Sequence, residues 1–347
     1  MQKLTASWCA ASVALVGAAA ITTTSVTATV PTEYNAVAQN IQLTSGIDPF
    51  AAWQEVFTTA KDNVTSLWNT FALAPLVSTQ QGLVNLIHGD FTSPTAILQA
   101  IAQPPLDISQ TPPDLWLSND LIHTVIAALT PQLLPDDFPL STSTVETLLS
   151  FAASSLAGEL MAPMGPLISP LVALGNSTVD LFNALFGPDA DLTTALQDLI
   201  NIPADVVGGF LNGATLNLDA LLPLIAGQLP EHTDITSLSY TFGGLLSPGD
   251  TATDVNGFVT NAAPGSSPGI GGSLWNSLGL NIVQFNIINL DAPGVALGPI
   301  GAWLGTQEII AHAMGWDGTG NPLADLFGTA EASSASLFSD LGNLLGL

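Results

Sequence analysis

The chain has 347 residues, with 28 Asp and Glu against two Lys, Lys3 and Lys61, no Arg and a formal net charge of −26. Binding to nucleic acid or to anionic lipid head groups depends on Lys and Arg, so the composition excludes nucleic acid as a partner and argues against phosphate-handling enzymes. The apolar fraction of 47% supplies a core for one large or two ordinary domains.

Residues 1–28 have the pattern of a cleavable secretory signal peptide. Lys3 supplies the positive start, the run from Ala6 to Ile21 is uncharged and apolar or small, and Val26-Thr27-Ala28 fits a cleavage site. A membrane anchor needs about 20 apolar residues, so this shorter run favours a signal. Cys9 would leave with it, which excludes disulfides, thiolate catalysis and Cys-based zinc sites from the mature chain.

Residues 29–45 show no sustained periodicity and are predicted to form an extended leader. The region 46–205 is predicted to be helical, and its first helix has Asp48 as N-cap and Pro49 as first helical residue. Apolar residues recur along this helix at spacings of three and four and form a stripe, at Phe50, Trp53, Phe57, Ala60, Val64, Leu67 and Phe71, with Trp68 widening it. The stripe predicts a helix face directed to the core, although the same face would also serve an oligomer.

Apolar periodicity and proline-rich joints predict further helices in this region. They are Thr79–Ile87, Thr95–Ala102 opened by Ser93-Pro94, Pro113–Leu129, Ser143–Leu160, Asp180–Phe186 and Asp191–Leu199.

The stretch Leu160–Val179 carries no charge and has two interpretations. A membrane span would need a sustained apolar run of about 20 residues. Pro163, Pro166 and Pro170, together with Gly165, interrupt the run and would break a helix. The sequence therefore favours a buried helix–turn–helix over a span.

A Gly-rich region with β-strands is predicted over 206–291. Polar and apolar residues alternate in Leu216-Asn217-Leu218 and in Thr236–Phe242, and Leu280–Ile288 is a further strand. The region 292–322 is predicted to hold a helix from Pro299 to Met314 and a turn. Its apolar face comprises Ile300, Trp303, Leu304, Ile310, Ala311 and Met314.

The tail 323–347 repeats a Leu-Phe pattern and is predicted to be a loosely held amphipathic helix. The predicted fold class is therefore mainly α with a small antiparallel β subdomain (α+β), consisting of a helical N-terminal half, a Gly-rich β segment and a C-terminal helix.

No motif of the chain makes a complete catalytic, cofactor-binding or metal site. The segment Gly265–Gly269 has the G-x-S-x-G spacing of a hydrolase nucleophile elbow around Ser267. An elbow needs a strand before it and a helix after it, whereas Pro264 and Pro268 stand there, so a loop is favoured. A similar segment around Ser177 lacks the closing glycine.

Two other patterns favour structural interpretations. Glu308 and His312 lie four residues apart on a predicted helix, which suits an acid–base pair or half a metal site but is more often a surface contact. Asp317, Thr319 and Asn321 place oxygens at alternate positions like the start of a calcium loop, but Pro322 replaces the required glycine, so a helix-terminating turn is favoured. The remaining histidines, His88, His123 and His232, show no mutual ligand spacing.

Five segments within residues 41–322, in this order, resemble one known family. They are IQLTSGIDPFAAWQEVFTTA, GGFLNGATLNLDALLPLI, SLSYTFGGLLSPG, GIGGSLWNSLGLNI and APGVALGPIGAWLGTQEIIAHAMGWDGTGNPL. The chain resembles the exported actinobacterial family of outer-membrane porins of the GjpA type, found in bacteria with mycolic-acid envelopes. The resemblance implies residence in the outer mycolate layer among envelope lipids, and passive passage of small hydrophilic solutes or ions.

The acidic balance of the chain is compatible with a cation-preferring path. Only two or three segments alternate as the strands of a transmembrane barrel would. A pore is therefore expected to require a homo-oligomer of mainly helical subunits. The alternatives are a secreted or wall-associated structural or interaction protein without a pore and, remotely, a serine hydrolase using Ser267. We expect no enzyme activity, cofactor or metal.

Overall fold

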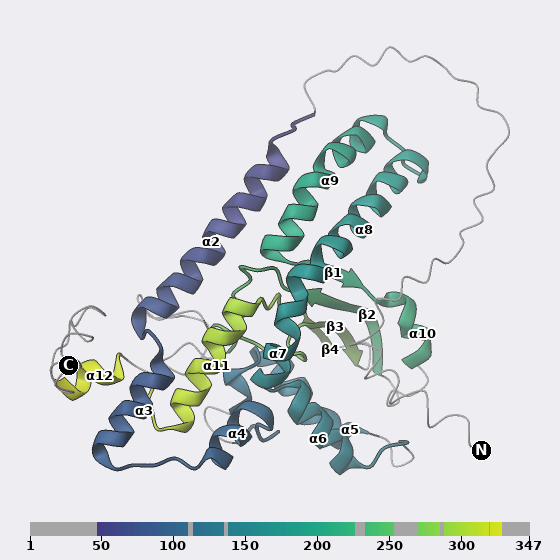
Figure 1. The fold of residues 1–347 in the computed structure, drawn as a ribbon. Coiled ribbons are helices and arrows are strands. Elements are labelled where there is room, and N and C mark those ends of the chain that lie inside the picture. The colour runs from purple at the N-terminus through teal and green to yellow at the C-terminus, as the bar shows by residue number, and fades with distance from the viewer. Residues whose placement is uncertain are drawn as a thin grey trace, which may run out of the picture. The chain divides into compact units, whose positions relative to one another are not determined.

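Helices surround one small antiparallel sheet in the computed structural model (Figure 1). The fold class predicted from the sequence, mainly α with a small antiparallel β subdomain, is confirmed. The predicted signal (1–28) and leader (29–45) lie outside the described residues. The structure describes residues 47–109, 114–134, 138–225, 233–252, 269–284, 288–318 and 320–327, all within one compact unit, Ile47–Leu347.

The helical elements follow one another along the chain with short connections. The α-helices are α2 (Ala51–Leu73), α3 (Val77–His88), α4 (Pro94–Ala102), α5 (Leu121–Leu133), α6 (Thr142–Ala152), α7 (Ser155–Met161), α8 (Gly165–Phe186), α9 (Leu192–Asn212), α10 (Leu222–Ile225), α11 (Pro299–Ala313) and α12 (Pro322–Phe327). The 3-10 helices are η1 (Asp114–Leu117), η2 (Ala162–Met164) and η3 (Asp219–Leu221).

The sheet is an antiparallel meander of four strands in sequence order: β1 (Ala214–Asn217), β2 (Thr233–Phe242), β3 (Leu278–Gln284) and β4 (Ile288–Ala292). One face forms a core in which Leu238, Leu280 and Ala292 pack with Ile126 of α5. The strand predicted over Leu280–Ile288 is wrong as a single element, because β3 ends at Gln284 and β4 begins at Ile288.

Two predicted helices are each divided by a polar residue that begins a new helix. Between η1 and α5, Asp120 accepts a hydrogen bond from the backbone N–H of His123, and within Ser143–Leu160 the Ser154 hydroxyl accepts one from Ala157 N–H. Such side chains satisfy N–H groups that lack a partner within the helix. The predictions over Pro113–Leu129 and Ser143–Leu160 are therefore wrong as single helices.

Prolines end fewer helices than the sequence predicted. Helix α8 is continuous from Gly165 through Pro170 to Phe186, so the predicted helix–turn–helix over Leu160–Val179 is wrong. Pro166 lies in the first turn of α8, where a backbone N–H would have no acceptor within the helix, so proline costs no hydrogen bond there. Helix α9 likewise continues through Pro203 and ends at Asn212, past the predicted Leu199.

The C-terminal helix α11 is confirmed within one residue, and its end is a helix-terminating turn, as predicted. Gly315 has a φ of +100°, its N–H donates to His312 O at 2.9 Å, and Trp316 N–H donates to Ala311 O at 2.9 Å. These two bonds define a Schellman motif. The side chain of Trp316 then packs with Ala311 and with Val77 of α3.

The first residues of the predicted loose tail are tightly packed, so the prediction is wrong for them. Leu323 and Ala324 of α12 are buried against Leu83 and Val84 of α3. The backbone N–H of Leu323 also donates to Gln80 Oε1 at 3.3 Å. The rest of the tail, 328–347, lies outside the described residues.

Candidate functional site

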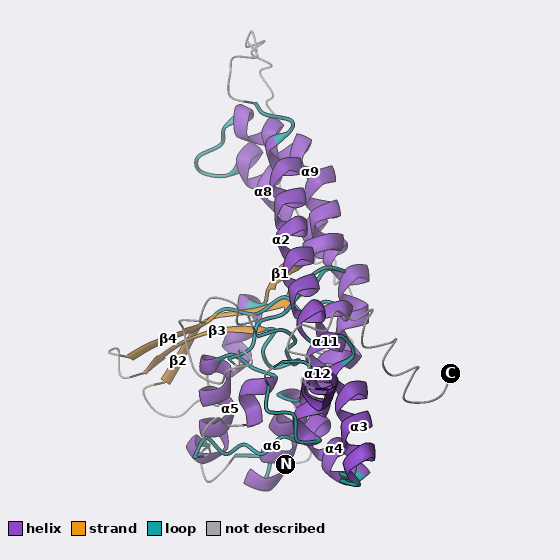
Figure 2. Cartoon of the chain, turned by 90° about the vertical axis from the view of Figure 1, so that its left-hand side faces the viewer, coloured by secondary structure: helices purple, strands orange, loops and turns teal. Residues whose placement is uncertain are grey.

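Three long helices, α2, α8 and α9, form what we call the helical arm. Helix α9 contacts both α8 and α2, and both views show α8 and α9 continuing beyond the sheet (Figure 1, Figure 2). The arm is joined to the sheet on one side, because Ser169 Oγ lies 3.0 Å from Phe242 O and Asn176 Nδ2 donates to Thr215 O at 2.9 Å.

Hydrogen bonds hold α2 to α9 near both ends of their contact. Asp48 N–H donates to Gln197 Oε1 at 2.8 Å, and Gln197 Nε2 donates back to Asp48 O at 3.0 Å. At the other end, Asn212 Nδ2 donates to Val56 O at 2.9 Å. Asp48 also accepts from Phe50 and Ala51 N–H, so it serves the start of α2 as predicted, although the helix begins at Ala51 rather than at Pro49.

The arm exposes an unusual number of large apolar side chains. The predicted core-facing stripe of α2 is wrong in part: Ala60 and Leu67 are buried, whereas Phe50 is 74% and Trp68 is 64% exposed. Large apolar side chains exposed in this number suit contact with a partner or a membrane. The exposed members are Phe50, Phe57, Val64 and Trp68 beside or on α2, Leu167, Leu171, Leu174, Val179, Phe182, Leu185 and Phe186 on α8, and Leu192, Leu199, Ile200 and Phe210 on α9.

Among the described residues, the continuous segment Ser155–Phe186 is long and apolar enough to cross a membrane by length and composition, with a mean hydropathy of 1.3. A core helix of a soluble protein passes the same test. The burial of this window is nevertheless only 39%, unlike that of a typical core helix. Length and composition thus agree with the exposed apolar surface without proving a span.

A second feature is a buried polar cluster that joins the start of α5 to the loop before β3. Ser273 Oγ donates to Asn119 Oδ1 at 2.6 Å, and Asn276 Oδ1 accepts from Asp120 N–H at 2.9 Å. Trp275 Nε1 donates to His123 O at 3.0 Å. All these groups find partners inside the protein, so the cluster fastens two segments that are far apart in the sequence.

His123, at the centre of this cluster, is fully buried and lies between two acceptors. Its Nδ1 is 2.6 Å from Asp120 Oδ2 and its Nε2 is 2.7 Å from Leu278 O. Both ring nitrogens are therefore engaged, and the imidazole is held between the side chain of Asp120 and the backbone of Leu278.

The surroundings of His123 are acidic. Burial, and after it the negative charge of Asp120, raises the pKa of Asp250, whose backbone carbonyl accepts a hydrogen bond from Asn276 Nδ2 at 2.7 Å. Both nitrogens of the His123 ring are engaged by Asp120 and Leu278, so among the described residues neither contacts a hydroxyl group. The cluster thus lacks the nucleophile–base contact of a hydrolase.

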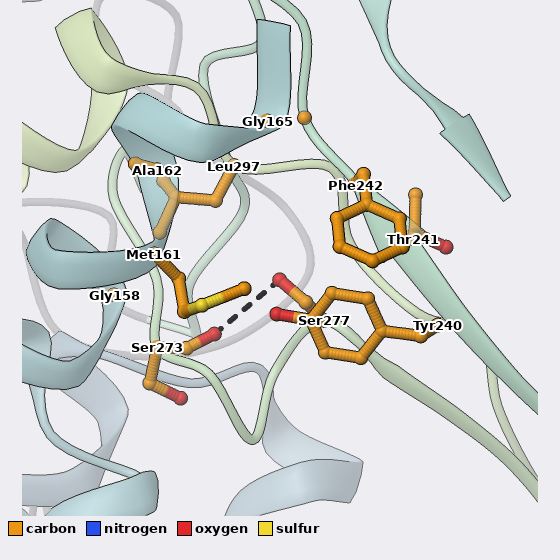
Figure 3. Close-up of a pocket in the computed structure, with 11 residues that line it drawn as sticks. Gly158, Met161, Ala162, Gly165, Tyr240, Thr241, Phe242, Ser273, Ser277 and Leu297 are labelled. Carbon is orange, nitrogen blue, oxygen red and sulfur yellow. Dashed lines mark hydrogen bonds between the residues drawn. The ribbon is translucent and has the colours of Figure 1, made fainter. Parts of the chain in front are cut away.

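A small hollow beside the cluster is too small for an organic substrate. It is lined by residues of α7, β2, the loop before β3 and the loop before α11, among them Met161, Tyr240, Ser273, Ser277 and Leu297 (Figure 3). Its free volume of about 10 Å³ suits roughly one water molecule. Burial raises the pKa of Tyr240 to about 12, which keeps its phenol protonated.

The structure separates most of the candidates predicted from the sequence. Ser267 and His232 lie outside the described residues, and His88 is exposed. Ser177 Oγ donates to Asp205 Oδ2 at 2.7 Å and joins α8 to α9 rather than serving as a nucleophile. Within the described ranges, no group of three or more His, Cys, Asp or Glu is placed to hold a metal ion.

Glu308 and His312 do not form an ion pair, and Glu308 departs from the expected surface contact. Its carboxyl group lies in the interior, where desolvation raises the pKa to about 8. Burial lowers the pKa of His312, and its ring lies 5.1 Å from that of Trp316. Both side chains thus belong to the packing of α11.

The raised pKa of Glu308 predicts a decline in stability with rising pH. The folded chain retains a proton that the unfolded chain releases above the ordinary value of 4.5, so stability is lost as the pH rises from there to about 8. Glu308→Gln keeps the shape and removes the ionisation. We expect the variant to be more stable than the wild type at pH 8 and to have a smaller pH slope in urea denaturation.

An unchanged slope in the Glu308→Gln variant would contradict this assignment. The slope is not expected to vanish, because Asp250 also has a raised pKa. Glu55→Gln, an exposed change on α2, is the matched control and should leave the slope as it is.

The described residues define a mainly helical protein with an exposed apolar arm and a buried polar cluster at the start of α5. Comparison with known family models, characterised proteins and solved structures finds no match to this chain. The functional argument therefore depends on the arm, on the charge balance and on the resemblance described above.

Proposed function

We propose that the chain is an exported cell-envelope protein that resides in the outer lipid layer and forms a pore for small hydrophilic solutes or ions. The observation that carries this proposal is the apolar surface of the helical arm, on which Leu167 and Leu171 are each 65% exposed. Water is a poor surrounding for such a surface, whereas a lipid layer is a favourable one.

Two further arguments support the proposal. The resemblance to outer-membrane porins of the GjpA type concerns segments from residue 41 to residue 322, and the pattern of residues 1–28 is that of an export signal. The conducting path is proposed to form between copies of the chain, because only two or three segments of the sequence alternate as the strands of a barrel would. The net charge of −26 would favour cations in that path.

The second candidate is a secreted or wall-associated interaction protein without a pore. The same arm favours it, since an exposed apolar helix face also binds an apolar partner. Neither candidate includes an enzyme activity, a cofactor or a metal.

Conductance across planar bilayers tests the pore directly. The chain from residue 29 onward, added to neutral-lipid bilayers, is expected to give discrete current steps, and in a KCl gradient the reversal potential should show a preference for K⁺ over Cl⁻. A heat-denatured sample is the control. Absence of discrete steps at every protein concentration would favour the interaction protein, and a preference for Cl⁻ would contradict the cation path.

A further inference from the structure

We infer that one face of α8, bearing Leu167, Leu171, Leu174, Phe182 and Leu185, contacts the acyl chains of a net-neutral lipid layer. We call this face the α8 stripe. The inference rests on the proposed residence in the envelope, and it names the element and the kind of lipid.

The stripe is continuous along the helix. Its residues follow one another at spacings of four, three, eight and three, which at about 100° per residue keeps them on one side. The distance from Leu167 to Leu185 is about 27 Å at 1.5 Å per residue, close to the roughly 30 Å of a bilayer interior. These side chains are 39–65% exposed, so the described part of the chain leaves them largely uncovered.

The opposite face of α8 is made of small residues. Gly165, Ser169, Ala173 and Ser177 recur at every fourth position and are buried. The buried residues of α9 are again small, at Ala195, Ala204, Gly208 and Gly209, and of these Gly209 lies against Ser169 and Ala173 of α8.

The two helices approach each other so closely that glycine is required. A Cβ atom on Gly209 would lie 2.7 Å from Ser169 O and 3.0 Å from the Cβ atom of Ala173. A helix in water normally buries its large apolar side chains and exposes polar ones. The reverse order, with small residues inside and large ones outside, is how helices pack in lipid, where close backbone approach replaces the hydrophobic effect.

The one charged residue of α8 lies away from the stripe, as contact with acyl chains requires. Asp180, the one charged residue of α8, follows Leu167 by thirteen positions and so lies about 220° around the helix from it. It faces the side of α9, where it acts electrostatically on Asp198. The stripe itself is therefore neutral.

The net charge of the chain indicates whether the stripe would contact neutral or anionic lipid. An anionic lipid surface would be repelled by the net charge of −26, whereas a net-neutral lipid layer carries no such penalty. The α8 stripe therefore fits neutral lipid better than it fits anionic lipid.

The mature chain has no cysteine, which allows a single-site test. Leu171→Cys on the stripe and Leu98→Cys on α4, which are 65% and 57% exposed as leucines, are each labelled with a polarity-sensitive fluorophore. The full mature protein is mixed with phosphatidylcholine vesicles that contain acyl-chain spin labels. Quenching is expected at position 171 and not at position 98, and vesicles rich in phosphatidylglycerol should give less quenching.

A charge on the stripe gives a second, independent measurement. Leu171→Asp should reduce flotation with phosphatidylcholine vesicles at least about tenfold, since a charge in the acyl region costs more than the roughly 1.4 kcal/mol of a tenfold change. Leu98→Asp should leave flotation unchanged. Circular dichroism confirms that both variants are folded.

The outcomes distinguish this inference from the proposed function. Quenching at position 171 without discrete conductance would uphold the stripe and contradict the pore. Discrete conductance with no quenching at position 171, or with equal quenching at both positions, would overturn the stripe. Concentration-dependent shielding of position 171 without lipid would show that a second copy is the occupant and would also overturn the inference.

Discussion

Replacing His123 with leucine is expected to lower the free energy of unfolding by about 1–3 kcal/mol, the usual cost of leaving buried hydrogen-bonding groups without a partner. The change leaves the side chain of Asp120 without its partner at 2.6 Å and the carbonyl of Leu278 without its donor at 2.7 Å. Guanidinium denaturation of the mature chain measures the effect.

His88→Leu is the matched control for this prediction. His88 is exposed on the last turn of α3, so its loss should change stability by no more than about 0.5 kcal/mol. A loss for His123→Leu that is no larger than that of the control would show that the two hydrogen bonds of the His123 ring do not stabilise the fold.

Gly209→Ala is expected to destabilise the arm by about 1–3 kcal/mol, which is the usual cost of overpacking. The new methyl group would lie 2.7 Å from Ser169 O and 2.9 Å from Ser169 C, and backbone atoms cannot move aside as a flexible side chain can. The helices α8 and α9 would have to separate, which weakens the contact between the small residues along them. Thermal or chemical denaturation of the purified variant measures the loss.

Gly175→Ala makes the same glycine-to-alanine change in α8, but there the effect on stability is expected to be favourable. Nothing lies within 4 Å of a Cβ atom at Gly175, which is also within a helix, so alanine should stabilise the chain by about 0.5–1 kcal/mol. If both substitutions destabilise equally, the close approach of α8 and α9 is not what limits residue 209.

Helix positions were largely predictable from the sequence, whereas helix boundaries were not. The N-cap pattern at Ser93-Pro94 is local and correctly gave the start of α4, with Ser93 Oγ accepting from Ala96 N–H at 3.2 Å. Asp120 and Ser154 are equally good N-caps, but they lie within apolar patterns that continue through them. Periodicity alone therefore merged two pairs of helices.

Which face of a helix is buried could not be read from apolar periodicity. On α2 and α8 that periodicity was clear, but it does not say whether the apolar side meets a core or the surroundings of the protein. The series Gly165, Ser169, Ala173 and Ser177 was a usable signal that was not recognised. Small residues at every fourth position indicate close helix packing and leave the large residues on the outside.

Of the two hydrogen bonds of the His123 ring, only the one to Asp120 could be predicted from the sequence. The spacing of Asp120 and His123 places them within one helical turn, so their contact is local. The acceptor Leu278 lies 155 residues away, and Asn276 lies 156 residues from Asp120. Neither distance follows from a pattern along the chain, so the sequence offered no reason to treat this histidine differently from His88.

The packing of α11 and α12 against α3 has a consequence for the order in which the protein is made. Asn85 Nδ2 bonds Met314 O across 229 positions, and Leu323 N–H bonds Gln80 Oε1 across 243 positions. Helix α3, near the start of the chain, therefore forms part of its core only when residues near the end of the chain are present. The chain is synthesised from its N-terminus onward, so these cores are expected to close only after the last segments have been made.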